Sequence, residues 1–154
     1  MPVGTCELNA TVTAPATLPV TVRDSGGGVY VVSTAGPVTV ANGGGDITTS
    51  GTGGPLTLDT FGGNITTAAA DSATVTATSG GGDVQLSFNR VPRAVRVDTS
   101  GGDITINLPA SPAGYRVTTH TDGGNVTDSV PQDDSSPHVV TATTGGGDIV
   151  INQE

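Results

Sequence analysis

Residues 95–106 read Val-Arg-Val-Asp-Thr-Ser-Gly-Gly-Asp-Ile-Thr-Ile, and variants of this pattern recur along the chain. Apolar and polar residues alternate on both sides of a Gly-Gly-Asp turn. An alternation with a period of two is typical of strands that bury one face and expose the other. Each copy of the pattern therefore predicts two short strands joined by a tight turn.

The turn occurs seven times, and aligning the copies on it shows how regular the chain is. Two glycines precede Asp or Asn in six copies, and they precede Gly28 in the first copy. Successive copies lie 18, 18, 19, 20, 22 and 23 residues apart, which leaves no room for a βαβ unit. The six complete turns are Gly44-Gly45-Asp46, Gly62-Gly63-Asn64, Gly81-Gly82-Asp83, Gly101-Gly102-Asp103, Gly123-Gly124-Asn125 and Gly146-Gly147-Asp148.

Two further columns are apolar in every copy. The residue after the turn is always Val or Ile, and the residue eight positions before the Asp or Asn is always Val or Leu. Repeats of this length predict one solenoid coil each, with like residues stacked at about 4.8 Å. We therefore predict an all-β fold: a single-domain parallel β-solenoid over residues 1–154, with an N-terminal cap strand in 1–19 and seven coils of 18–23 residues in 20–154. An antiparallel meander or two-sheet sandwich is the alternative.

Three smaller expectations follow from the repeat. The paired glycines are expected to adopt positive φ in a tight bend. The joins between coils lengthen toward the C-terminus, so the longer loops are expected together on one edge. The last strand, residues 148–151, is expected to end the stack with little to cover it. Such an exposed edge would allow an end-to-end homo-oligomer.

Composition and charge restrict the classes of partner. Fourteen acidic residues against five arginines give a net charge of −9, which disfavours nucleic acid and anionic lipid. No stretch is long and apolar enough to span a bilayer, so no direct membrane insertion is expected in this fragment. Cys6 is the only cysteine, and it is either a free thiol or half of a bridge to a cysteine elsewhere.

The pattern Ser/Thr-Gly-Gly-Asp-Ile/Val-Thr-Ile resembles that of the bacterial β-strand-repeat adhesins, also described as toast-rack domains. Residues 98–106, 143–151 and 109–117 carry the resemblance, and residues 6–13 with 19–22 resemble actinobacterial members. The resemblance implies a right-handed β-solenoid that is displayed outside the membrane on a helix anchor or acts in cell-envelope sensing. It brings no catalytic residues, and this chain departs from it at Gly28, where Asp is usual.

The column of Asp and Asn residues is the most specific candidate site. Asp83 stacked on Asp103 would place two carboxylates about 5 Å apart, and such a row of oxygens could bind Ca²⁺. The structural interpretation, which we favour, is that each side chain accepts hydrogen bonds from the backbone N–H groups of its own turn. Asp83 and Asp103 are thus the candidate metal ligands, and no residue is predicted to bind a cofactor.

No catalytic residue is predicted, and the protein is not expected to be an enzyme. His120 and His138 occupy different columns and are expected on the surface. A glycan-processing groove is an alternative, although aromatic residues for sugar stacking are scarce. Its basic residues, expected in neighbouring coils near Asp98, would be Arg90, Arg93, Arg96 and Arg116.

These observations favour a non-catalytic, extracytoplasmic interaction module, adhesin-like or envelope-sensing, that is a fragment of an anchored protein. Its protein or cell-surface partner is unknown. The alternatives are a structural module that assembles through its solenoid ends and a Ca²⁺-binding solenoid. A cytoplasmic location is the alternative for its place in the cell.

Overall fold

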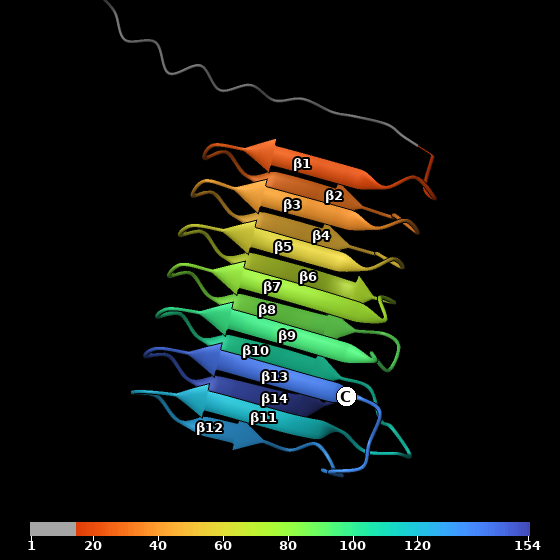
Figure 1. Cartoon of the computed structure of the whole chain (residues 1–154), viewed down its shortest axis with the longest axis vertical. Coiled ribbons are helices and arrows are strands. Elements are labelled where there is room, and N and C mark those ends of the chain that lie inside the picture. The colour runs from red at the N-terminus through yellow and green to blue at the C-terminus, as the bar shows by residue number, and fades with distance from the viewer. Residues whose placement is uncertain (1–14) are drawn as a thin grey trace, which may run out of the picture.

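The computed structural model describes residues 15–154, and these residues form a solenoid of two parallel sheets (Figure 1). Each of seven coils contributes one strand to each sheet, and every strand pair is parallel. The all-β parallel solenoid predicted from the repeat is confirmed, and the antiparallel alternative is wrong. Cys6 and most of the predicted cap strand lie outside the described residues. Residues 15–19 contain a turn and no strand.

The strands alternate between the sheets along the chain. In spatial order, sheet A contains β1 (Val20–Asp24), β3 (Val38–Asn42), β5 (Leu56–Thr60), β7 (Thr74–Ser79), β9 (Ala94–Thr99), β13 (Val139–Thr144) and β11 (Arg116–Thr121). Sheet B contains β2 (Val29–Val32), β4 (Ile47–Ser50), β6 (Ile65–Ala70), β8 (Val84–Phe88), β10 (Ile104–Leu108), β14 (Ile149–Gln153) and β12 (Val126–Asp128).

The core lies between the two sheets and is built from the predicted columns. Ile47, Ile65 and Ile104 are each 0% exposed, and their strands pair in register through the column after the turn. Stacking small β-branched side chains in this way removes apolar surface from water without large aromatic residues. The branched apolar residues therefore supply most of the core, as the alternation predicts.

The coil order departs from the order of the sequence at the C-terminal end. Strand β13 lies between β9 and β11, and β14 lies between β10 and β12. Ile149 pairs with Ile104 on one side and with Val126 on the other. The last coil of the chain is therefore inserted between the fifth and sixth coils, and the expectation that successive copies always stack on one another is wrong for this coil (Figure 1).

Two polar residues of the sixth coil, above all Asp128, favour its place at the end of the stack. Asp128 holds the register position of Ile151, and Thr119 holds that of Ala142, so both belong to inner columns. Stacking in sequence order would bury the Asp128 carboxylate between Ile106 and Ile151. A buried carboxylate without a partner costs several kcal/mol. At the end of the stack, Asp128 instead accepts hydrogen bonds from Val130 and Gln132.

The insertion also corrects the expectation about the exposed end. Strand β14, which holds most of residues 148–151, lies inside sheet B, and the edge strands at this end are β12, with three residues, in sheet B and β11, with six, in sheet A. A short edge strand and an inward-directed charge such as Asp128 both oppose pairing with other chains. The two longest joins, residues 109–115 and 129–138, carry the chain past the inserted coil and back, and they lie together at one edge, as predicted (Figure 1).

The turn glycines are required for a different reason from the predicted one. Among the described residues, positive φ occurs at Gly51, Gly114, Ser33 and Ala69, and at none of the paired turn glycines. A Cβ on Gly102 would instead collide with the carbonyl of Gly82 in the neighbouring coil. The second glycine of each of the six complete turns therefore permits a close approach between backbones.

Candidate functional site

The Asp and Asn side chains of the turns form a ladder along one edge of the solenoid. Asp83 Oδ1 accepts a hydrogen bond from the backbone N–H of Asp103, in the next coil, at 2.9 Å. The acceptor thus reaches the neighbouring turn, and the expectation that it serves its own turn is wrong. The same bond links Asn64 to Asp46 at 2.8 Å, Asp83 to Asn64 at 2.9 Å, Asp148 to Asp103 at 2.8 Å, and Asn125 to Asp148 at 2.7 Å.

A second ladder, which the sequence analysis did not single out, satisfies the N–H groups within each turn. The buried Thr99 hydroxyl donates to the Gly82 carbonyl at 2.9 Å and accepts from the Gly102 N–H at 3.3 Å. A hydroxyl can do both because it carries one donor and two acceptor sites. The column four residues before the Asp or Asn shows the signal, since it holds Asn42, Thr60, Ser79, Thr99, Thr121 and Thr144.

The inserted coil brings three carboxylates into consecutive positions of the first ladder, because Asp148 follows Asp103 and Asp83. Asp83 and Asp103, the two candidate metal ligands, do lie in neighbouring coils. Within residues 15–154, however, no three His, Cys, Asp or Glu side chains converge on a point where a metal ion could bind. The part that these carboxylates play in the structure is to hold adjacent turns together.

The outer face of sheet A carries an exposed aromatic side chain. Phe61 follows β5 and is 82% exposed, the highest fraction among the exposed large apolar side chains of the described chain. Its neighbours in the adjacent coils are Gly43 and Gly80, and a Cβ on either would collide with a backbone carbonyl, of Ser25 and of Phe61 respectively. Both flanking positions are therefore glycine for backbone reasons, and the ring has no side chain on either side.

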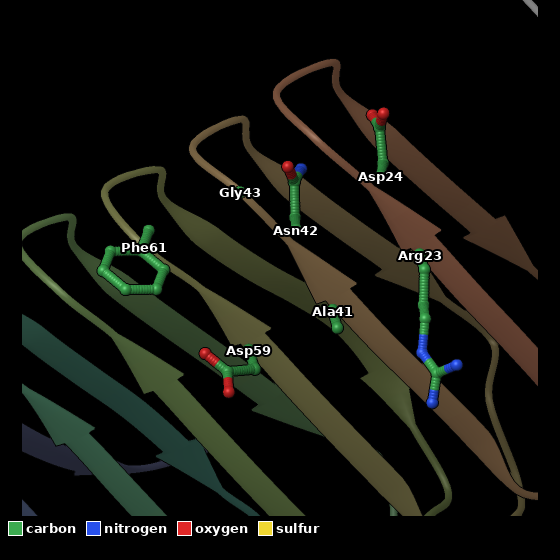
Figure 2. A pocket seen from close by; sticks show the side chains of 7 residues that line it. All are labelled: Arg23, Asp24, Ala41, Asn42, Gly43, Asp59 and Phe61. Carbon is green, nitrogen blue, oxygen red and sulfur yellow. The ribbon is translucent and has the colours of Figure 1, made fainter.

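An open hollow lies on each side of the Phe61 ring. The first lies toward β1 and contains Arg23, Asp24 and Asp59, with Arg23 extended along the strands beside Ala41 (Figure 2). The second lies toward β9 and contains Asp59 and Asp98. In the second hollow, Asp98 Oδ2 lies 3.7 Å from an Arg96 guanidinium nitrogen. Two carboxylates beside an exposed ring are groups that attract cations.

The remaining basic residues do not gather as the glycan alternative requires. Arg90 pairs with Asp71 at 3.8 Å, and Arg116 lies in β11, which the inserted β13 separates from β9 and Arg96. Neither hollow beside Phe61 is lined by any of these four arginines.

The two histidines differ in environment. His120 is exposed and lies 3.1 Å from Asp122. His138 is half-buried, which corrects the expectation of a surface residue, and its Nδ1 lies 2.9 Å from the Pro92 carbonyl oxygen. Its ring centroid lies 6.0 Å from that of Tyr115. His138 therefore helps to hold the long loop 129–138 against the solenoid.

Tyr115 anchors the other long join. Its side chain is 0% exposed, and its hydroxyl donates to the Pro109 carbonyl at 2.6 Å. Burial raises the pKa of the Tyr115 hydroxyl above its usual value. At the tip of the second join, Ser135 donates two hydrogen bonds to Asp133, and these lower the pKa of that carboxyl. Both joins are thus ordered by local hydrogen bonds.

The sequence of this chain matches the profile of a known protein family. Residues 20–152 match the profile of the family described as Toastrack DUF4097. The chain belongs to the Toastrack family. The match begins at β1 and ends in β14, so it covers every coil, including the inserted one. No curated protein and no solved structure matches the chain significantly. Among residues 15–154 there is no helix that is long and apolar enough to cross a membrane.

A Toastrack solenoid of this kind fits a non-catalytic interaction module. The signal for Phe61 was present in the sequence, since it is an aromatic residue in a column that otherwise holds Ser25, Gly43, Gly80, Ser100, Asp122 and Gly145. The surface around Phe61, comprising the ring and its two hollows, is hereafter called the Phe61 surface.

Proposed function

We propose that this Toastrack domain is a non-catalytic interaction module that acts outside the cytoplasm, as an adhesin-like or envelope-sensing domain. The observation that carries the proposal is the exposed ring of Phe61, which directly follows β5 in the turn at the edge of sheet A. An isolated Phe held in water gains nothing for folding, whereas aromatic residues contribute strongly when a partner covers them. The Phe61 surface is therefore the part of the module that contacts the partner.

The architecture supports this role because it keeps the surface rigid. The strands under the Phe61 surface are paired on both sides, and the two side-chain ladders tie each turn to the next. A rigid surface loses little conformational entropy when a partner binds. Repeat proteins commonly use such extended surfaces for binding.

Location is tested by protease treatment of intact cells of the source organism. An epitope tag is inserted beside Asp134, which lies exposed at the tip of the loop 129–138. We expect added protease to remove the tagged protein while a cytoplasmic marker survives. A tagged protein that is digested only after cell lysis would contradict an extracytoplasmic role.

Binding is tested with the purified domain on envelope preparations from the same cells. We expect Phe61→Ala to reduce the retained protein severalfold. Tyr30→Ala is the matched control, because Tyr30 is an aromatic residue with 68% exposure on the outer face of sheet B. Equal retention of the wild type and Phe61→Ala would show that the Phe61 surface does not make the contact.

A further inference from the structure

We infer that the second hollow of the Phe61 surface, between Phe61 and Asp98, receives a lysine or arginine side chain from a basic segment of a protein partner. The inference rests on the proposed interaction function and adds the chemistry of the partner. It depends on the arrangement of two carboxylates around one exposed ring.

The two carboxylates share a column on the outer face of sheet A. Asp59 pairs in register with Thr78, and Thr78 pairs with Asp98. Parallel strands are about 4.8 Å apart, so a cation seated over Thr78 would lie about 5 Å from each flanking column position. Thr78 is uncharged and short, which leaves this place open between the two acids.

The ring of Phe61 lines the second hollow together with Asp59 and Asp98. The coil that contributes Thr78 has Gly80 beside Phe61, so no side chain separates the ring from this space. A cation within about 6 Å of an aromatic centroid is attracted by the negative face of the ring. The aliphatic stem of a lysine or arginine can cover the ring while the charged group meets the carboxylates.

The charges of the protein favour a basic side chain as the occupant, and they favour the second hollow over the first. The chain has a net charge of −9, which raises the local concentration of cationic partners. Asp59 takes part in no ion pair among the described residues, and Asp98 has only the 3.7 Å contact with Arg96, whose side chain is 65% exposed. Arg23 lines the first hollow and repels a second cation, whereas no arginine lines the second hollow. The exposed Arg96 side chain can turn away from Asp98 as a basic side chain enters, and we therefore place the basic side chain in the second hollow.

The probe for this inference is a fluorescein-labelled peptide of Lys-Gly-Gly repeats, with Gln-Gly-Gly repeats as the uncharged match. Anisotropy at low ionic strength measures affinity, and amide chemical shifts locate the bound peptide. We expect only the lysine peptide to bind, with shifts centred on residues 59–61, 78–80 and 98–100. Salt should weaken the binding, because exposed charges are screened.

The variants distinguish the contribution of the Phe61 ring to peptide affinity from a general attraction between the acidic protein and a basic peptide. Phe61→Ala should raise Kd by roughly twofold to fivefold, the fold-change expected for an exposed cation–π contact, and Phe61→Trp should preserve binding. Asp59→Asn with Asp98→Asn should weaken it further. Tyr30→Ala and Asp134→Asn are the controls, because each removes an exposed group of the same kind elsewhere, and both should bind as the wild type does.

Three results would overturn the inference. The lysine peptide could bind all variants equally, its shifts could centre on Asp83, Asp103 and Asp148, or a glycan could bind through Phe61 while the lysine peptide does not. If the peptide fails but Phe61→Ala still loses envelope retention, the partner chemistry is wrong and the interaction role stands. If the tagged protein proves cytoplasmic while the peptide binds as expected, the proposed location fails and the basic partner stands.

Discussion

The backbone N–H of Asp148 donates to Oδ1 of Asp103 at 2.8 Å, across 45 positions of the chain. This bond is the equivalent of the one between Asp103 and Asp83, so the inserted coil continues the ladder without a break. It also makes Asp83, Asp103 and Asp148 three consecutive carboxylates, about 4.8 Å from coil to coil. Like charges at this separation repel one another, and the accepted N–H bonds offset that repulsion.

Replacing Asp103 by Asn should therefore leave the protein equally stable or more stable. The amide oxygen still accepts the N–H of Asp148, and the charge in the middle of the row disappears. Asn64 already acts in this way toward Asp83 at 2.9 Å. Chemical denaturation at low and high salt would measure the effect. The wild type should gain more stability from added salt than Asp103→Asn does, since salt screens the repulsion.

Asp103→Ala separates the hydrogen bond from the charge. It removes the same repulsion but leaves the Asp148 N–H without its protein acceptor. The net loss should be about 0.5–1.5 kcal/mol relative to Asp103→Asn. Equal stability of the two variants would mean that the ladder bond contributes nothing at this exposed edge.

The two glycines of one turn should differ sharply in their tolerance of a side chain. A Cβ on Gly102 would collide with the Gly82 carbonyl and the Asp83 nitrogen, whereas a Cβ on Gly101 meets nothing within 4 Å. Gly102→Ala should cost about 1–3 kcal/mol or more, because backbone cannot move aside cheaply. Gly101→Ala should be neutral or stabilising by up to about 1 kcal/mol. Thermal unfolding followed by circular dichroism compares them, and similar losses would contradict the close-approach explanation.

The solenoid could be predicted from the sequence because every coil uses the same pattern of buried and exposed residues and the same turn. The Val and Ile columns and the Gly-Gly turns recur with small changes in spacing, and such columns favour in-register parallel stacking. The reason for the glycines was predicted wrongly, because a clash between neighbouring coils cannot be seen within one repeat. The column containing Thr99 gives a weaker signal, because its members (Asn, Thr and Ser) share hydrogen-bonding capacity rather than residue type.

The order of the last two coils could not be read from the repeat alone, since every copy fits either position. The discriminating signal was nevertheless present in two residues. Thr119 and Asp128 occupy columns that are apolar in the neighbouring inserted coil. The charge of Asp128 is the stronger signal. Two hydroxyls can satisfy each other inside the stack, as Thr49 and Thr67 of the same column do at 2.9 Å, whereas a lone carboxylate needs an end position where water or a nearby side chain can satisfy it. The proposed partner surface was harder to predict because Phe61 is one aromatic residue in a column of otherwise small or acidic residues.

Alkaline unfolding should report on Tyr115. Burial raises the pKa of its hydroxyl above 10, so the folded protein retains this proton at a pH where the unfolded chain loses it. The associated stability is fully present below pH 10 and is lost as the pH rises through the folded pKa. Tyr115→Phe should lower stability at neutral pH by about 0.5–1.5 kcal/mol, through loss of the bond to Pro109, and should flatten the alkaline decline.

Melting temperatures between neutral pH and pH 11 would measure this effect. Tyr30→Phe is the control, because the Tyr30 side chain is 68% exposed, and it should decline with pH as the wild type does. The chain has two tyrosines, so ultraviolet absorbance can follow both hydroxyls in the wild type and one in each variant. A decline in Tyr115→Phe as steep as that of the wild type would assign the alkaline loss to another group.

Coil order can be tested by crosslinking across sheet B. Thr105 pairs in register with Val150, which pairs with Thr127, so Thr105 and Thr127 are two coils apart. In a Cys6→Ser background, a cysteine pair at 105 and 150 should form a disulfide. A pair at 105 and 127 should not, because about 9.6 Å between strands exceeds the reach of the bond. A crosslink between 105 and 127 in the otherwise unchanged chain would show that the coils stack in sequence order.

The same crosslinks test why the last coil is inserted. If burial of Asp128 and Thr119 is what excludes sequence order, replacing them by Leu and Val removes most of that penalty. The doubly substituted chain should then populate both orders, and the 105–127 pair should begin to crosslink alongside the 105–150 pair. Each single substitution measures how much one residue contributes to the preference for the inserted order. Asp128→Leu should have the larger effect, because a charge costs more to bury than a hydroxyl. An unchanged preference for the 105–150 pair would place the cause in the joins 109–115 and 129–138, whose Tyr115 and His138 contacts would then hold the order by themselves.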